Sequence, residues 1–157
     1  SASSEPGQGT SFKIFLPRAE EQTDAGRDSA PAAFESGSGN ILLVEDDPMV
    51  LQIAKEMLES IGYRVEIADA PLKAVSLCSK DPSIDLVVTD VIMPAMTGKE
   101  LRDRLAELRP GIRVLYMSGH TANTIERHGV LEEGAHFLQK PFTINDLAAK
   151  VKEVMNS

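Results

Sequence analysis

From Asn40 to the end of the chain, short apolar runs alternate with longer segments in which apolar residues recur at helical spacing. An uninterrupted apolar run is typical of a buried parallel strand, and the helical spacing is typical of a helix with one buried face. The expected strands cover residues 41–44, 64–68, 86–89, 112–117 and 135–138, and the expected helices cover residues 48–61, 71–80, 101–108, 121–130 and 144–154. Repeated strand–helix units predict an α/β fold, in which a parallel sheet carries helices on both faces.

Single positions add detail to this pattern. The strand at 64–68 is less apolar than the others, which suits an edge of the sheet. Asp47 and Thr143 precede helical segments and are expected to act as N-caps. The buried face of the third helix is expected to carry Leu101, Leu105 and Leu108.

The residues before Asn40 follow a different pattern. Residues 19–39 lack apolar periodicity, contain several acidic side chains and end in Ser36-Gly37-Ser38-Gly39. Such a composition is typical of a flexible linker. We therefore expect three parts: a short segment at 1–18, a linker at 19–39 and a folded domain at 40–157.

Composition limits the partners that this chain can have. The 157 residues carry a formal net charge of −8, which argues against nonspecific binding to nucleic acids and against direct contact with anionic membranes. The single cysteine, Cys78, excludes an internal disulfide and is expected in the core. We expect no membrane span and no signal peptide, and the initial Ser suggests a piece of a longer chain, which leaves a membrane anchor in the parent open.

Polar side chains gather where the expected strands end. Glu45 and Asp46 follow the first strand, Asp90 the third, Ser118 the fourth and Lys140 the fifth. Parallel strands share their carboxyl ends, so these side chains should converge at one edge of the sheet, where ligands bind in open α/β sheets.

The residue types at this edge indicate a chemistry. Clustered carboxylates repel one another and need a cation, and an oxygen-only donor set favours Mg²⁺, with Mn²⁺ as a substitute. Lys140 adds a positive charge, Ser118 adds a hydroxyl, and Gly119 allows close approach to its amide. Together these groups suit phosphoryl transfer to a carboxylate, which depends on positioning and on charge neutralisation.

Four motifs in this order make the chain recognisable. It resembles the receiver domain of two-component response regulators over residues 40–157. The motifs are Val44-Glu45-Asp46-Asp47, Thr89-Asp90-Val91-Ile92-Met93-Pro94 with Gly98, Met117-Ser118-Gly119 and Lys140-Pro141-Phe142. The resemblance implies a flavodoxin-like, doubly wound sheet of five parallel strands in the order 2-1-3-4-5.

The resemblance also implies a role for each acidic residue. Asp90 corresponds to the phosphoacceptor, which takes its phosphoryl group from a phosphohistidine. Asp46 and Asp90 correspond to direct ligands of Mg²⁺, Glu45 acts on the ion through water, and the backbone carbonyl of Ile92 completes the metal site.

Further roles implied by the resemblance concern the bound phosphoryl group and the response to it. Ser118, Gly119 and Lys140 correspond to phosphoryl contacts, and the peptide bond between Lys140 and Pro141 is expected to be cis. Ser118 and Phe137 correspond to the conformational switch. Ile92 and His120 occupy positions that tune the lifetime of the phosphoryl group.

The first eighteen residues carry a second, shorter resemblance. Gly7-Gln8-Gly9-Thr10, followed by alternating residues, is similar to the last glycine box and closing strand of a histidine-kinase ATP-binding domain. This implies a hybrid sensor kinase as the parent, with the receiver at its C-terminus. The implied partners are the dimerisation-phosphotransfer domain of the same parent or a separate histidine phosphotransfer protein, and the implied location is cytoplasmic.

Two other functions remain open at this point. A degenerate receiver would serve only for docking or for autoinhibition of the kinase, although the complete acidic set argues against this. A phosphatase with an aspartyl-phosphate intermediate would need a second Asp two positions after the nucleophile, where this chain has Ile92. The receiver fragment itself is expected not to be an enzyme, apart from phosphoryl transfer to itself and slow autodephosphorylation.

Overall fold

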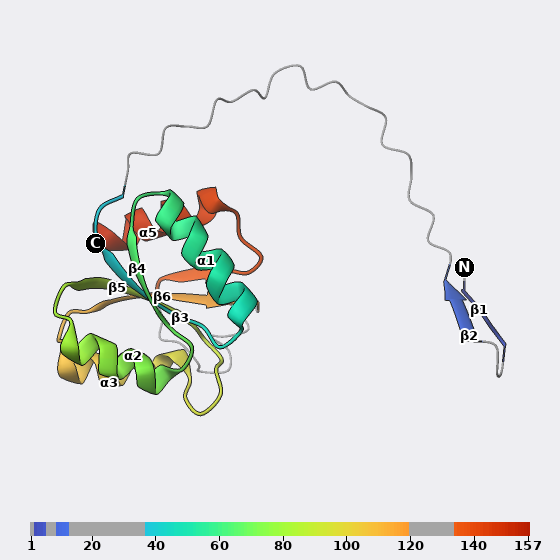
Figure 1. The fold of residues 1–157 in the computed structure, drawn as a ribbon, viewed down its shortest axis with the longest axis horizontal. Helices are drawn as coiled ribbons and strands as arrows, with labels where there is room; N and C mark the ends of the chain where they lie inside the picture. Colours follow the sequence, from blue (N-terminus) through green and yellow to red (C-terminus); the bar gives the residue numbers. More distant parts are fainter. Residues whose placement is uncertain (1, 6–8, 13–36, 120–133) are drawn as a thin grey trace, which may run out of the picture. The chain divides into compact units, whose positions relative to one another are not determined.

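The computed structural model describes residues 2–5, 9–12, 37–119 and 134–157 (Figure 1). The chain divides into two compact units, Ser1–Ala33 and Phe34–Ser157, which we describe separately. Within the described residues, no helix is long and apolar enough to cross a membrane.

The first unit contains a small antiparallel hairpin. Strand β1 (Ala2–Glu5) pairs with strand β2 (Gly9–Phe12), and Ala2 lies opposite Phe12. The strand expected after the glycine motif is therefore present as far as Phe12 but is not isolated. Its partner β1 is short and polar, so it lacks the apolar pattern that would have predicted it.

The second unit is built on one five-stranded sheet, in which all neighbouring strands are parallel. Numbered within this unit, the strand order is 2-1-3-4-5, as predicted, with the less apolar strand at an edge. Across the sheet, the strands are β4 (Arg64–Ala68), β3 (Asn40–Val44), β5 (Ile84–Asp90), β6 (Arg113–Ser118) and β7 (Phe137–Gln139).

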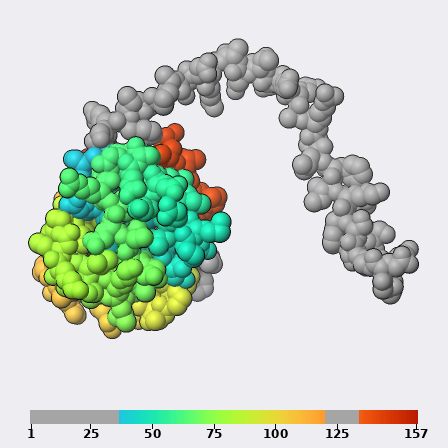
Figure 2. Space-filling view, viewed as in Figure 1, coloured from blue at the N-terminus to red at the C-terminus, as the bar shows by residue number. Residues whose placement is uncertain are grey.

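Helices cover both faces of this sheet. Helices α1 (Pro48–Ser60) and α5 (Ile144–Met155) pack on one face, and helices α2 (Pro71–Lys80) and α3 (Gly98–Leu108) pack on the other (Figure 1). In the space-filling view, side chains of α1 and α2 form a continuous surface around the edge strand β4 (Figure 2). The helix expected at 121–130 lies outside the described residues.

The core forms two layers because successive strand residues point to opposite faces. In β3, Ile41 and Leu43 pack toward α1 and α5, whereas Leu42 and Val44 pack toward α2 and α3. All four side chains are fully buried. This explains why the central strands read as uninterrupted apolar runs.

Some element boundaries differ from the predicted ones. Strand β5 begins at Ile84 rather than at residue 86, because the exposed, polar Asp85 hides the start of the apolar run. The parallel register with β3 shifts at this point. The amide of Asn40 donates to Asp85 Oδ2 at 2.9 Å, so the polar side chain belongs to the start of the sheet.

The observed bounds of the last two strands also differ from the predicted ones. Strand β6 covers 113–118 and β7 covers 137–139, whereas 112–117 and 135–138 were predicted. Apolar character places a strand but does not mark where ladder pairing starts.

In α3, Leu101 and Leu105 are buried as predicted, but Leu108 is 49% exposed. Gly98 takes the third buried position of this helix instead. Its start is set by a capping box between Thr97 and Glu100, which the apolar pattern does not show.

Candidate functional site

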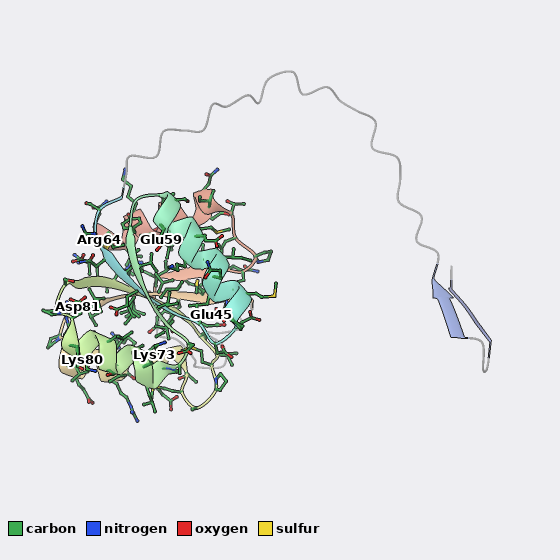
Figure 3. The ribbon with its side chains drawn as sticks, in the orientation of Figure 1. Glu45, Glu59, Arg64, Lys73, Lys80 and Asp81 are labelled. Carbon is green, nitrogen blue, oxygen red and sulfur yellow. The ribbon has the colours of Figure 1, made fainter. Side chains whose placement is uncertain are left out.

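The candidate site lies at the edge of the sheet that is formed by the carboxyl ends of the parallel strands. The predicted site residues follow or close these strands. Glu45 and Asp46 follow β3, Asp90 closes β5, and Lys140 follows β7. Figure 3 places Glu45 at this edge and Arg64 and Asp81 near the opposite one. Parallel pairing alone brings these segments together.

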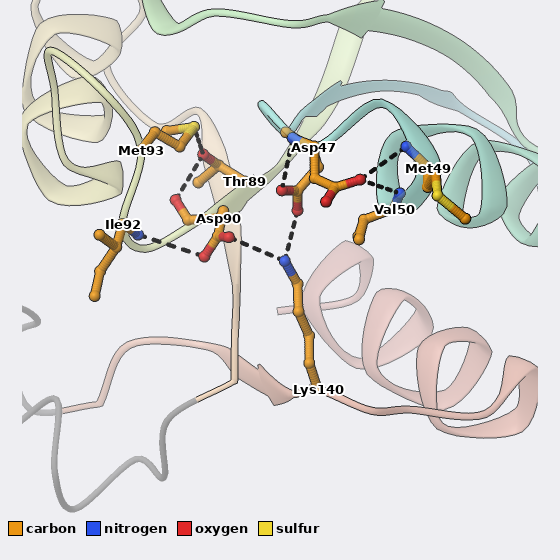
Figure 4. A network of polar contacts seen from close by, with 9 residues as sticks. Asp47, Met49, Val50, Thr89, Asp90, Ile92, Met93 and Lys140 are labelled. Atoms are coloured by element: carbon orange, nitrogen blue, oxygen red, sulfur yellow. Dashed lines mark hydrogen bonds and ion pairs between the residues drawn. The ribbon is translucent and has the colours of Figure 1, made fainter. Parts of the chain in front are cut away.

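Lys140 joins two of the acidic residues. Its ammonium donates to Glu45 Oε2 at 2.6 Å and to Asp90 Oδ2 at 3.0 Å (Figure 4). The first contact connects residues 95 positions apart in the sequence. The convergence predicted for Glu45, Asp90 and Lys140 is therefore confirmed.

Burial gives these charges an unusual environment. Glu45 is 2% exposed, and this burial raises the pKa of its carboxyl above the usual range, although the bond from Lys140 works in the opposite direction. Burial also disfavours the charged form of Lys140, but bonds and charges from Glu45 and Asp90 outweigh it and raise the pKa of Lys140. Lys140 is therefore cationic at neutral pH.

Asp46 completes a group of three carboxylates that could hold a metal ion. Glu45, Asp46 and Asp90 each offer one oxygen, and these oxygens lie within 4.8 Å of one another. Lys140 offsets only one of the three negative charges when all are ionised. A donor set made only of oxygen, with negative charge left over, fits a hard divalent cation such as Mg²⁺.

Asp47 adjoins this group but serves the helix. Its side chain accepts hydrogen bonds from the amides of Met49 and Val50, at 2.8 and 3.1 Å (Figure 4). These contacts satisfy two donors at the start of α1, as predicted for an N-cap. The Asp47 amide also donates to Glu45 Oε1 at 3.3 Å, which links the cap to the site.

The backbone around Asp90 is tightly packed. The Thr89 hydroxyl donates to the carbonyl of Asp90 at 3.0 Å. A Cβ atom on Gly98 would lie 2.5 Å from the same carbonyl oxygen, so only glycine fits there without a shift. The Ile92 amide makes a long contact with Asp90 Oδ1, at 3.4 Å (Figure 4).

The other predicted site residues lie at the same edge or behind it. Ser118 is buried, and its carbonyl accepts a 2.7 Å hydrogen bond from the amide of Lys140. Gly119 is exposed, and Ile92 is an exposed apolar side chain. Phe137 is half-buried against the layer of the core that faces α2 and α3.

Two further expectations concern residues near the end of this region. The Lys140–Pro141 peptide bond is cis, as expected. His120 lies outside the described residues.

The predictions missed two residues, Thr89 and Gly98, that pack against the backbone carbonyl of Asp90. Thr89 is fully buried, and its contact with the Asp90 carbonyl was not foreseen. A hydroxyl inside an apolar strand needs a hydrogen-bond partner, so this residue could have been singled out from the sequence. The close approach of Gly98 to Asp90 has no comparable signal, because it depends on how α3 returns to the strand.

Comparison with known proteins agrees with this geometry. The family described as response regulator receiver domain matches residues 41–152. The chain is 37% identical to the sensor kinase CckA of Brucella abortus (strain 2308), over 97% of this chain. It spans only 17% of the length of that kinase.

Solved structures show the same fold. The receiver domain of the hybrid histidine kinase CckA superposes with a TM-score of 0.63 at 32% identity, covering 74% of this chain and 99% of that domain. The receiver domain of the sensor histidine kinase PA1611 from Pseudomonas aeruginosa PAO1 gives 0.66 at 26% identity, covering 77% and 100%, and its structure has a magnesium ion in the active-site cleft. With its sheet order, its acidic edge and its family match in agreement, the chain belongs to the response regulator receiver domain family.

Proposed function

We propose that residues 40–157 act as the phosphoacceptor of a two-component phosphorelay, with Asp90 as the acceptor. The observation that carries this proposal is the Lys140 ammonium, which binds Asp90 and the buried Glu45 together. A lysine held in this way keeps a positive charge beside the Asp90 carboxylate, where a phosphoryl group would arrive.

In the proposed step, an Asp90 carboxylate oxygen attacks the phosphorus of a phosphohistidine. The new oxygen–phosphorus bond forms as the nitrogen–phosphorus bond breaks, and the electron pair of the broken bond returns to the imidazole. Lys140 and the Gly119 amide hold the phosphoryl oxygens in place.

The acidic group is proposed to hold Mg²⁺, as the magnesium-bound relative suggests. Asp46, Asp90 and the carbonyl of Ile92 would be direct ligands, and Glu45 would act through water. When bound, the ion supplies positive charge that offsets the repulsion between the carboxylates and the incoming phosphoryl group.

We assign the response to phosphorylation to Ser118 and Phe137. The Ser118 hydroxyl would turn toward the phosphoryl group, and Phe137 would follow into the space that it leaves. Ser118 is buried and Phe137 half-buried, so a change at either position alters the packing of β6 and β7. Ile92 and His120 remain the proposed tuning positions.

The parent chain is proposed to be a hybrid sensor kinase. Residues 1–18 would be the end of its ATP-binding domain, and residues 19–39 the linker. In support, the match to sensor kinase CckA covers 97% of the chain, more than the family match at 41–152 can supply. The proposed cytoplasmic partners are the dimerisation-phosphotransfer helices of the parent or a separate phosphotransfer protein.

Intact-mass measurement after incubation with acetyl phosphate and Mg²⁺ tests the proposed acceptor. We expect one added phosphoryl group on the full chain and none on Asp90→Asn. Asp85→Asn is the matched control, because Asp85 is an exposed carboxylate at the start of the same strand, and it should be phosphorylated like the parent.

The same measurement separates the alternatives. An unmodified parent chain would contradict the proposal and favour a receiver used only for docking. Rapid hydrolysis of added phosphate esters would instead indicate a phosphatase. Ile92 provides no proton donor for that reaction, so we expect only slow loss of the Asp90 phosphoryl group.

A further inference from the structure

A shallow groove lies between the end of α1 and helix α5, separate from the acidic site. Its volume is about 250 Å³, below the roughly 300–1,000 Å³ of typical small-molecule sites. This size suits one large side chain better than a separate ligand. The groove is lined by Gly37, Ile61, Tyr63, Asn145, Ala148, Ala149 and Lys152.

The chain enters the receiver at the rim of this groove. The Gly37 amide donates to the Ile61 carbonyl at 2.8 Å. The backbone of Gly37 lies against the aromatic ring of Tyr63, so closely that a Cβ atom at residue 37 would overlap the ring. Residue 37 is therefore fixed at the groove by its backbone.

The sequence just before Gly37 offers an occupant of matching chemistry. Between Pro17 and Ile41, Phe34 is the only large apolar residue. Three residues span at most about 10 Å of extended chain, so Phe34 stays within reach of the groove. The boundary between the two compact units also falls directly before Phe34, which assigns it to the receiver unit.

We propose that the side chain of Phe34 docks in this groove and holds residues 34–36 against α1 and α5. An aromatic ring loses exposure to water there, against Tyr63 and the alanines of α5. The linker proposed at residues 19–39 would then end at residue 33, which shortens the tether between the receiver and the domain proposed to precede it.

A single tryptophan in the full 157-residue chain tests this docking. The chain has no Trp, so Phe34→Trp introduces the only one. We expect emission at shorter wavelength. We also expect acrylamide quenching severalfold weaker than for Ala30→Trp, a linker position before the segment proposed to dock. Ala149→Glu, added to Phe34→Trp, should raise the quenching to the level of Ala30→Trp, because it places a charge on the groove wall.

Gln52→Glu is the matched control for Ala149→Glu. It adds the same charge at an exposed position of α1 outside the groove, and it should leave the quenching of Phe34→Trp unchanged. Equal quenching of Phe34→Trp and Ala30→Trp would overturn the proposal. So would protection that Ala149→Glu does not remove, or protection that grows with protein concentration, since that would indicate docking of a second copy.

The native phenylalanine gives an independent measurement. Phe34→Ala should lower the midpoint of urea unfolding in the parent chain and change it much less in the Ala149→Glu background. Equal shifts in the two backgrounds would show that Phe34 acts somewhere other than the groove, and would contradict the proposal.

Discussion

Gly98 supports the end of strand β5, next to Asp90, through its backbone. It occupies the first turn of α3, and its amide donates to the carbonyl of Val91 at 2.9 Å. A side chain at this position would meet the Asp90 carbonyl at 2.5 Å and the Tyr116 ring at 3.3 Å. The missing side chain lets the helix start directly beside the site.

Gly98→Ala should therefore destabilise the chain. In a helix interior, alanine is more favourable than glycine by about 1 kcal/mol of helix propensity. Overpacking against a fixed backbone costs about 1–3 kcal/mol, and we expect that cost to exceed the gain. Urea unfolding of both chains measures the difference in free energy.

Gly119→Ala is the control for this prediction. Among the residues that the structure describes, a Cβ atom there would meet nothing within 4 Å, so the free energy of unfolding should change by less than about 0.5 kcal/mol. Equal losses in the two variants would show that the close approach at Gly98 has no energetic cost.

At the residue scale, the sequence predicts the acidic edge better than its surroundings. Glu45, Asp90 and Lys140 could be placed together because strand ends meet by topology, whatever the side-chain packing. The contacts of Thr89 and Gly98 with the Asp90 carbonyl depend on the path of a loop. That path follows from tertiary packing, which apolar periodicity does not encode.

At the scale of elements, α5 shows how a helix end is fixed. The Thr143 side chain accepts a 3.2 Å hydrogen bond from the Asp146 amide, and Asp146 Oδ2 accepts from the amide and hydroxyl of Thr143. These hydrogen bonds from Thr143 lower the pKa of Asp146. The N-cap at Thr143 was predicted, whereas the equivalent box at Thr97 was not, because α3 begins at Gly98, one turn before its first buried leucine, Leu101.

The cap of α5 makes stability depend on pH. Because the pKa of Asp146 is lower in the folded chain than its ordinary 3.8, its contribution is present above that pH and is lost as the pH falls through the folded value. Asp146→Asn should thus unfold at lower urea than the parent at neutral pH. The gap between the two chains should close in acid.

The control for this pH dependence is Asp85→Asn, whose carboxylate accepts from the Asn40 amide and caps none of the helices that the structure describes. Unfolding midpoints measured across the acidic range should show a smaller change in the gap for this variant. A gap for Asp146→Asn that stays constant with pH would indicate that the carboxylate charge does not contribute to the cap.

At the scale of the whole molecule, repetition made the fold predictable. Each strand–helix unit repeats the same pattern of a buried apolar strand followed by a helix with one apolar face. Because the connections between parallel strands are right-handed, few arrangements of five strands remain. The hairpin of β1 and β2 has no such repetition, and its four-residue strands are too short for a periodic signal. The linker docking proposed for Phe34 likewise concerns one side chain, which no pattern reveals before the groove is known.

The proposed metal site links the stability of the whole molecule to Mg²⁺. Its three carboxylates come from two strand ends that meet only in the folded chain, so an ion bound there stabilises folding. At a concentration 100 times the dissociation constant, the gain is about 2.7 kcal/mol. We expect Mg²⁺ to raise the urea midpoint of the parent, EDTA to reverse this rise, and Asp46→Asn to abolish most of the effect.

Asp47→Asn is the control that distinguishes loss of a metal ligand from loss of negative charge nearby. It removes an adjacent charge but keeps a side-chain oxygen for the α1 cap. This variant should retain the rise of the urea midpoint with Mg²⁺. An equal loss of that rise in Asp46→Asn and Asp47→Asn would mean that Mg²⁺ responds only to the total negative charge of this loop.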